Sequence, residues 1–210
     1  MPRTPFAAAA LAALLMSAPN LAPAADQDGH FAVKDAGAQT CGALLKSWEE
    51  KNRDLGQYAG WIAGYVTGVN QLTNGLYDLA AWQSTETLLG MTRSICQQAP
   101  AETRFLDAFA ALVQRISPVR LQRKSDLEGV RRDGKAIVIY KAILAEARIR
   151  LAREGFPSGD PNAPFDQRAS DAFLAYQKAF ELDETGLPDQ KTLFSLFMGR
   201  DGEGGAGDGN

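Results

Sequence analysis

The chain has 210 residues, 45% of them hydrophobic and 22% charged, so it is long enough and apolar enough to bury one or two cores. One histidine (His30) and two cysteines (Cys41 and Cys96) are too few for a Cys/His zinc site or an iron–sulfur cluster, and they argue against a cysteine–histidine catalytic pair in the body of the fold. We therefore expect no metal and no cofactor, and the net charge of −3 also argues against nucleic acid as the main partner.

Residues 1–24 are typical of a secretory signal peptide. Arg3 precedes an apolar run at residues 6–16, and the small residues 22–24 follow as a cleavage site. An N-terminal membrane anchor is the alternative, but this run is short for a bilayer core about 30 Å thick. We expect a periplasmic protein with no transmembrane segment after cleavage, in which His30 lies close to the new N-terminus.

Export also decides how the cysteines are interpreted. In an oxidising compartment, Cys41 and Cys96 are expected to form one structural disulfide. Closing the loop between them corresponds to a stabilisation of about 4 kcal/mol on the chain-entropy estimate. A redox-active pair is the alternative, but such pairs usually have the close spacing Cys-x-x-Cys, which this sequence lacks.

The N-terminal half has the apolar spacing of a helical bundle. Helices are predicted at residues 41–51, 57–72, 84–96 and 100–116. Gly60, Gly64 and Gly68 share one face of the second helix, where each glycine costs about 1 kcal/mol relative to alanine. We expect a neighbouring helix to pack closely on this face; a ligand that approaches the bare backbone is the alternative.

Residues 118–135 break the helical pattern. Pro118 ends the preceding helix, and six basic and three acidic residues follow. We expect a solvated basic linker between two domains. The alternative is a site for an anionic partner such as lipid headgroups, wall polymers or nucleic acid.

The C-terminal half again has helical spacing. Helices are predicted at residues 136–155, 167–182 and 189–199. Gly155 is placed to end the first of them, and Asp189 to cap the last. Residues 200–210 contain five glycines and three acids, and we expect this tail to be disordered. The predicted class is therefore all-α, with two small helical bundles at residues 39–117 and 136–199.

The C-terminal bundle resembles the peptidoglycan-binding domain that accompanies many bacterial cell-wall enzymes. The matching residues keep the order and spacing of the family pattern: Leu151, Gly155, Phe156, Phe165, Ala172, Phe173, Tyr176, Gln177, Leu182, Thr185, Gly186, Asp189, Thr192 and Leu193. The sequence departs from the pattern at Ala163, Asp166, Ala169 and Glu181. This resemblance implies a three-helix fold and peptidoglycan as the partner.

The polar and aromatic residues of the loop between the first two helices of this bundle are the candidate ligand-binding set. They are Phe156, Asp160, Asn162, Phe165, Asp166, Gln167 and Arg168. Aromatic faces with amides and charged groups suit a ligand made of sugars and peptides. The alternative is that the two phenylalanines belong to the core and the polar side chains are only solvated.

The N-terminal bundle resembles the HdeA-like group of periplasmic helical proteins. The resemblance rests on Cys41, Trp61, Gly64, Tyr65, Gly68, Cys96, Pro100, Phe105 and Ala108. Some members of this group are acid-stress chaperones of the envelope, and related small disulfide-bonded domains are immunity proteins against peptidoglycan-cleaving effectors. The resemblance therefore implies a periplasmic protein client or a cell-wall hydrolase as a further partner.

The sequence as a whole predicts a non-catalytic, exported protein that tethers a helical chaperone-like or interaction domain to the cell wall. An inhibitor or immunity protein against a peptidoglycan hydrolase is one alternative. The other is an accessory part of a cell-wall hydrolase, whose catalysis would rest on carboxylates. The candidates for that role are Glu49, Glu50, Asp54 and Asp78.

Overall fold

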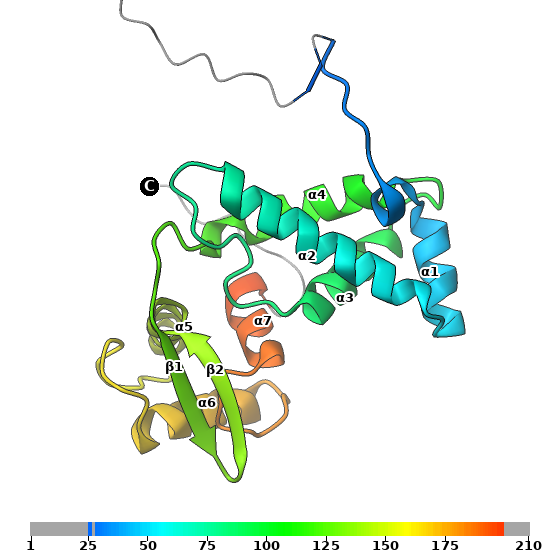
Figure 1. Ribbon diagram of the computed structural model, residues 1–210. Helices are drawn as coiled ribbons and strands as arrows, with labels where there is room; N and C mark the ends of the chain where they lie inside the picture. Colours follow the sequence, from blue (N-terminus) through cyan, green and yellow to red (C-terminus); the bar gives the residue numbers. More distant parts are fainter. Residues whose placement is uncertain (1–24, 27, 200–210) are drawn as a thin grey trace, which may run out of the picture. The chain divides into compact units, whose positions relative to one another are not determined.

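The computed structural model describes residues 25, 26 and 28–199 (Figure 1). The chain divides into two units, Met1–Ala32 and Val33–Asn210, and the second contains every helix and strand among the described residues. The predicted signal peptide, residues 1–24, and the predicted disordered tail, residues 200–210, lie outside the described residues.

The predicted all-α class is confirmed in that the described residues are mostly helical, with two short strands that we did not predict. In chain order the elements are η1 (Asp35–Ala38), α1 (Cys41–Glu50), α2 (Asp54–Leu72), α3 (Thr85–Cys96), α4 (Phe105–Ile116), η2 (Ser117–Val119), β1 (Leu127–Arg132), β2 (Lys135–Tyr140), α5 (Lys141–Arg153), α6 (Gln167–Ala179) and α7 (Gln190–Met198). None of these helices is both long and apolar enough to cross a membrane.

The helices α1 to α4 enclose one core and carry the predicted disulfide, which is confirmed. Cys41 begins α1 and Cys96 ends α3, and the bond joins them with their Cα atoms 5.0 Å apart. Phe105 of α4 is fully buried, and its ring lies 4.9 Å from that of Tyr58 in α2. The covalent link therefore lies within a packed apolar core.

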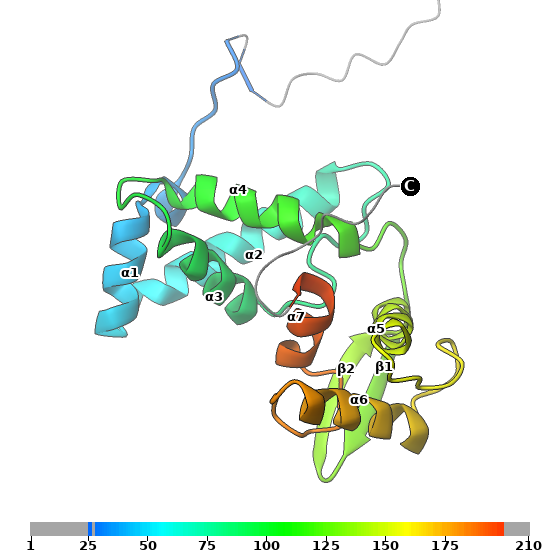
Figure 2. The ribbon, with the colours of Figure 1, turned by 180° about the vertical axis from the view of Figure 1, so that it is seen from behind.

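The face of α2 that carries the glycines is not covered as predicted. A Cβ atom built on Gly60, Gly64 or Gly68 would have no atom within 4 Å outside its own helical turn, so the expectation of a closely packed helix is wrong for the described residues. The helix lies in front of α3 and α4 in Figure 1 and behind them in Figure 2, and its buried residues are Tyr58 and Ile62. The glycines lie on a different face of α2 from this packed one.

The basic stretch 118–135 is not the solvated linker that we expected. Leu121 is buried, and its backbone pairs with that of Asp78 at 2.8 Å. The strand β1 begins at Leu127 and pairs in antiparallel register with β2. The physical reason is the sequence Asp133–Gly134, because both residues have positive φ (50° and 77°), as a tight hairpin turn requires.

This hairpin also corrects the start of the first C-terminal helix. Residues 136–140 belong to β2, and α5 begins at Lys141. Ile139 and Ile143 have helical spacing, but the run from residue 136 to 140 is rich in β-branched and aromatic residues, which favour a strand. Two local signals are confirmed: Gly155 follows the end of α5 with φ +91°, and the Asp189 side chain caps α7.

Within the second unit, α7 contacts the segment that leads into α3. The side-chain oxygen of Gln190 accepts from Ser84 N at 3.0 Å and from Thr87 Oγ1 at 2.7 Å. The rings of Trp82 and Phe197 lie 5.5 Å apart. The two predicted bundles therefore share contacts between residues more than 100 positions apart in the sequence.

Candidate functional site

A buried arginine forms hydrogen bonds with the loop between α5 and α6, residues 154–166. Arg148 of α5 is 2% exposed. Its guanidinium donates to Ser158 Oγ (3.1 Å), to Ser158 O (2.7 Å) and to Ala163 O (2.7 Å). A buried charge is costly unless it is hydrogen-bonded, so these contacts fix the loop and the arginine together.

A cavity of about 560 Å³ lies between this loop and α6. We call it the α6 cavity. Its walls include Phe156, Pro157, Gln167, Arg168, Asp171 and Ala172. Phe156 is half-buried, and its ring makes edge contacts with Tyr176 (5.6 Å) and Phe180 (6.0 Å), so one side of the ring belongs to the core and the other to the cavity.

The charged groups of the α6 cavity are connected to the hairpin. Asp171 Oδ1 accepts from Gln167 Nε2 at 2.8 Å and from Arg132 Nη1 at 3.1 Å. Arg132 of β1 also donates to Ser170 Oγ at 2.7 Å, and its side chain lies over Gly186, where an added Cβ would meet the arginine Cδ at 2.6 Å. An arginine that we assigned to the linker therefore neutralises an acid of the cavity.

A second, smaller cavity of about 210 Å³ lies on the other side of the loop. Its walls include Glu128, Lys141, Pro161, Asn162 and Pro164. The Glu128 carboxylate accepts from the backbone N–H of Phe165 at 2.7 Å, so the hairpin holds this end of the loop as well.

The seven predicted ligand-binding residues do not form one cluster. Phe156, Gln167 and Arg168 line the α6 cavity, and Asn162 lines the smaller one. Phe165 lines neither cavity, and its ring packs 6.1 Å from that of Phe173.

The two acids of the predicted set organise the backbone of the loop. Asp160 accepts from Asn162 N at 2.9 Å, and Asp166 caps α6 by accepting from Ala169 N at 2.8 Å. The cap explains why an aspartate is suited to position 166, where the family pattern has a glycine.

One fully buried polar residue of this region was in the family pattern but not among our candidates. Gln177 is fully buried. Its side-chain nitrogen donates to Thr185 Oγ1 (3.0 Å) and Thr192 Oγ1 (2.8 Å), and its side-chain oxygen accepts from Gly186 N (2.7 Å). These pattern residues are therefore partners in one network that holds the turn before α7.

Arg148 and Arg132 were also missed. Position 148 lies four residues after Leu144 and three before Leu151, on the buried stripe of α5, and a charged residue on such a stripe is the signal that could have identified it. No local pattern indicated the contact of Arg132 with Asp171, because it joins residues 39 positions apart.

The carboxylates considered for catalysis have ordinary surface or structural partners. Glu49 is exposed, and Glu50 forms an ion pair with Lys46 at 3.8 Å. Asp54 lies 3.5 Å from the Gln57 side-chain nitrogen, while Asp78 accepts from the backbone N–H of Ala80 at 3.0 Å. None of these carboxylates lines either of the two cavities.

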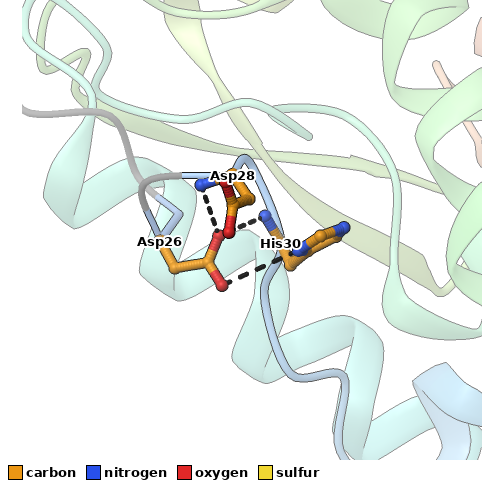
Figure 3. Close-up of side chains that lie close together, drawn as sticks. All are labelled: Asp26, Asp28 and His30. Atoms are coloured by element: carbon orange, nitrogen blue, oxygen red, sulfur yellow. Dashed lines mark hydrogen bonds and ion pairs between the residues drawn. The ribbon is translucent and has the colours of Figure 1, made fainter.

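In the N-terminal unit, Asp26, Asp28 and His30 lie close together (Figure 3). One Asp26 oxygen accepts from Asp28 N (3.0 Å) and His30 N (2.7 Å), and the other lies 3.8 Å from His30 Nδ1. All three side chains are exposed. Exposed groups of this kind are common without a metal, and we assign no metal site to them.

The C-terminal region, residues 127–199, consists of three helices and a hairpin around a hydrogen-bonded core, with a cavity beside a fixed loop. Comparison with known families shows that residues 142–196 match the family described as "Putative peptidoglycan binding domain". The match covers about a quarter of the chain. No curated protein and no solved structure matches the sequence. None of the comparisons supports the resemblance of residues 39–117 to HdeA-like proteins, which stays a prediction.

Proposed function

We propose that the protein is an exported, non-catalytic peptidoglycan-binding protein of the bacterial envelope. In this proposal residues 136–199 bind the cell wall, and residues 39–117 form a helical chaperone-like or interaction domain that is thereby held at the wall. The observation that carries the proposal is the family match at residues 142–196, which coincides with the loop and helix that line the α6 cavity.

Two further features support an envelope location. Cys41 and Cys96 are joined, which fits an oxidising compartment. Residues 1–24 have the layout of a signal peptide. A family that binds peptidoglycan would meet its ligand in the same compartment.

The test is co-sedimentation of the full chain, after removal of residues 1–24, with purified peptidoglycan sacculi. Ala175 is an exposed residue of α6 that lines the cavity, so Ala175→Trp fills the cavity without disturbing the core. The matched control is Ala63→Trp, on an exposed position of α2.

We expect the unsubstituted protein and Ala63→Trp to pellet with the sacculi, and Ala175→Trp to stay in the supernatant. If the unsubstituted protein stays in the supernatant, the proposed function is wrong. If all three proteins pellet equally, peptidoglycan binding stands but the α6 cavity is not the site.

A further inference from the structure

One charged side chain of the α6 cavity has no oppositely charged partner among the described residues, and its sign indicates the charge of the ligand. Two charged side chains, Arg168 and Asp171, line it. The Asp171 carboxylate already has a cationic partner, Arg132, at 3.1 Å; Arg132 also pairs at 3.3 Å with Asp133, which does not line the cavity. The side chain of Arg168 forms neither an ion pair nor a hydrogen bond with any other residue that the structure describes.

A second arginine lies on the opposite side of the same loop. A Cβ atom built on Gly159 would lie 3.6 Å from Arg168 Cδ and 3.7 Å from Arg148 Nη2, so the two arginines flank this glycine. The partners of Arg148 are uncharged oxygens of Ser158 and Ala163. Its positive charge is therefore not compensated by these partners.

The two loop acids that we predicted as ligand-binding residues do not cancel this charge inside the cavity. Asp160 and Asp166 are exposed, and each accepts a hydrogen bond from a backbone N–H of the loop or of α6. Neither lines the α6 cavity. An anionic group in the cavity would thus meet an unpaired guanidinium at Arg168, together with the uncompensated charge of Arg148 behind the loop.

We propose that the α6 cavity binds a free carboxylate of the peptidoglycan stem peptide, with Arg168 as its partner. This inference rests on the proposed function and names the part of the polymer that is recognised. The glycan strand offers uncharged N-acetyl sugars, whereas the stem peptides carry free carboxylates, and guanidinium pairs with a carboxylate through two parallel hydrogen bonds. Phe156 and Pro157 provide an apolar wall for the adjoining aliphatic side chains.

The experiment measures binding of the full chain, without residues 1–24, to three preparations. They are intact sacculi, sacculi whose carboxylates have been converted to methylamides, and stripped glycan, in which an amidase has removed the stem peptides and the lactyl carboxylates freed by that cleavage have been converted to methylamides. The variants are Arg168→Gln and Arg168→Lys, and the control is Arg115→Gln, an exposed arginine on α4. Circular dichroism verifies that each variant keeps its helices.

We expect Arg168→Gln to weaken binding to intact sacculi by about 10- to 100-fold, as for loss of a charge-assisted hydrogen-bonded pair. Arg168→Lys keeps the charge but loses the paired geometry and should fall between, while Arg115→Gln should bind normally. The unsubstituted protein should bind the methylamidated sacculi and the stripped glycan as weakly as Arg168→Gln binds intact sacculi.

The outcomes separate the two proposals. If the unsubstituted protein binds no sacculi, the proposed function fails. If it binds intact sacculi but binds methylamidated sacculi or stripped glycan equally well, or if Arg168→Gln binds normally, peptidoglycan binding stands and carboxylate recognition is overturned.

Discussion

The glycine face of α2 permits a sharp test of how this structure is stabilised. Gly60, Gly64 and Gly68 lie inside a 19-residue helix, and a Cβ atom added to any of them would meet open space. None of the three has a positive φ, so alanine would adopt the same backbone without strain. The structure therefore predicts a gain in stability from each Gly→Ala substitution.

The magnitude follows from the helix propensities. Alanine is favoured over glycine by about 1 kcal/mol per helix-interior site, so the triple variant should gain about 3 kcal/mol in the free energy of unfolding. For a chain of this size that corresponds to a rise in Tm of about 6–12 °C. Urea and thermal denaturation, followed by circular dichroism at the helical band, measure both quantities.

A matched control comes from a glycine that is covered. A Cβ atom on Gly37 would lie 2.4 Å from the indole ring of Trp61, so Gly37→Ala should lower the stability by about 1–3 kcal/mol. If the triple variant of α2 is no more stable than the unsubstituted protein, or is less stable, the face is not open in the folded chain and the reasoning fails.

Three other perturbations test the loop, the hairpin and the disulfide. Replacing Arg148 by methionine removes three hydrogen bonds and leaves their buried acceptors unpaired, so the free energy of unfolding should fall by about 2–4 kcal/mol in urea titrations; no change would show that the loop does not depend on the guanidinium. Burial, and to a lesser degree the negative charge of Asp78, raises the pKa of Tyr140 to about 12. The contribution of Tyr140 to the free energy of unfolding is therefore complete below pH 10 and is lost as the pH rises from 10 to 12. Tyr140→Phe should remove this part of the decline in stability at alkaline pH, and a pH profile identical to that of the unsubstituted protein would contradict the reasoning. Replacing both Cys41 and Cys96 by alanine should cost about 4 kcal/mol, measured by the same titration, and a loss near zero would mean that the unfolded chain is not constrained by the bond.

The helices and their ends could be predicted because their signals are local. Ser84 was placed at the start of a helix, and its side chain caps α3 by accepting from Thr87 N at 3.1 Å. Asp189 and Gly155 likewise act within one turn of the residues that they affect. The disulfide followed from the compartment and the number of cysteines, without knowledge of the fold.

The hairpin was missed because two periodicities compete in the same residues. Ile139 fits the helical spacing that continues through Ile143, and it also fits a strand, in which it is buried. The deciding signal is the turn Asp133–Gly134, which the many charged residues around it obscure in the sequence.

The site could be predicted only where the chain brings its own neighbours together. Phe156, Gln167 and Arg168 lie close to the ends of α5 and α6, the two helices that one short loop joins, and they line the same cavity. Phe165 also lies in that loop, but its ring packs on Phe173 of α6, and its backbone is held by Glu128 of β1, 37 positions earlier in the chain. Contacts of this kind have no signature in a single sequence.

The cavity that we propose as the binding site also depends on a residue of the hairpin that lies before residue 136, where we expected the C-terminal domain to begin. Arg132 precedes that boundary, yet it pairs with Asp171 in the wall of the α6 cavity and covers Gly186 in the turn before α7. A fragment starting at residue 136 would leave the Asp171 carboxylate without this cation, beside the position proposed for the carboxylate of the ligand. The unpaired Asp171 carboxylate and the ligand carboxylate would repel each other, so the fragment should bind sacculi more weakly than the full chain even where its helices fold. The family match alone, which starts at residue 142, therefore contains the walls of the cavity but not the group that neutralises one of them.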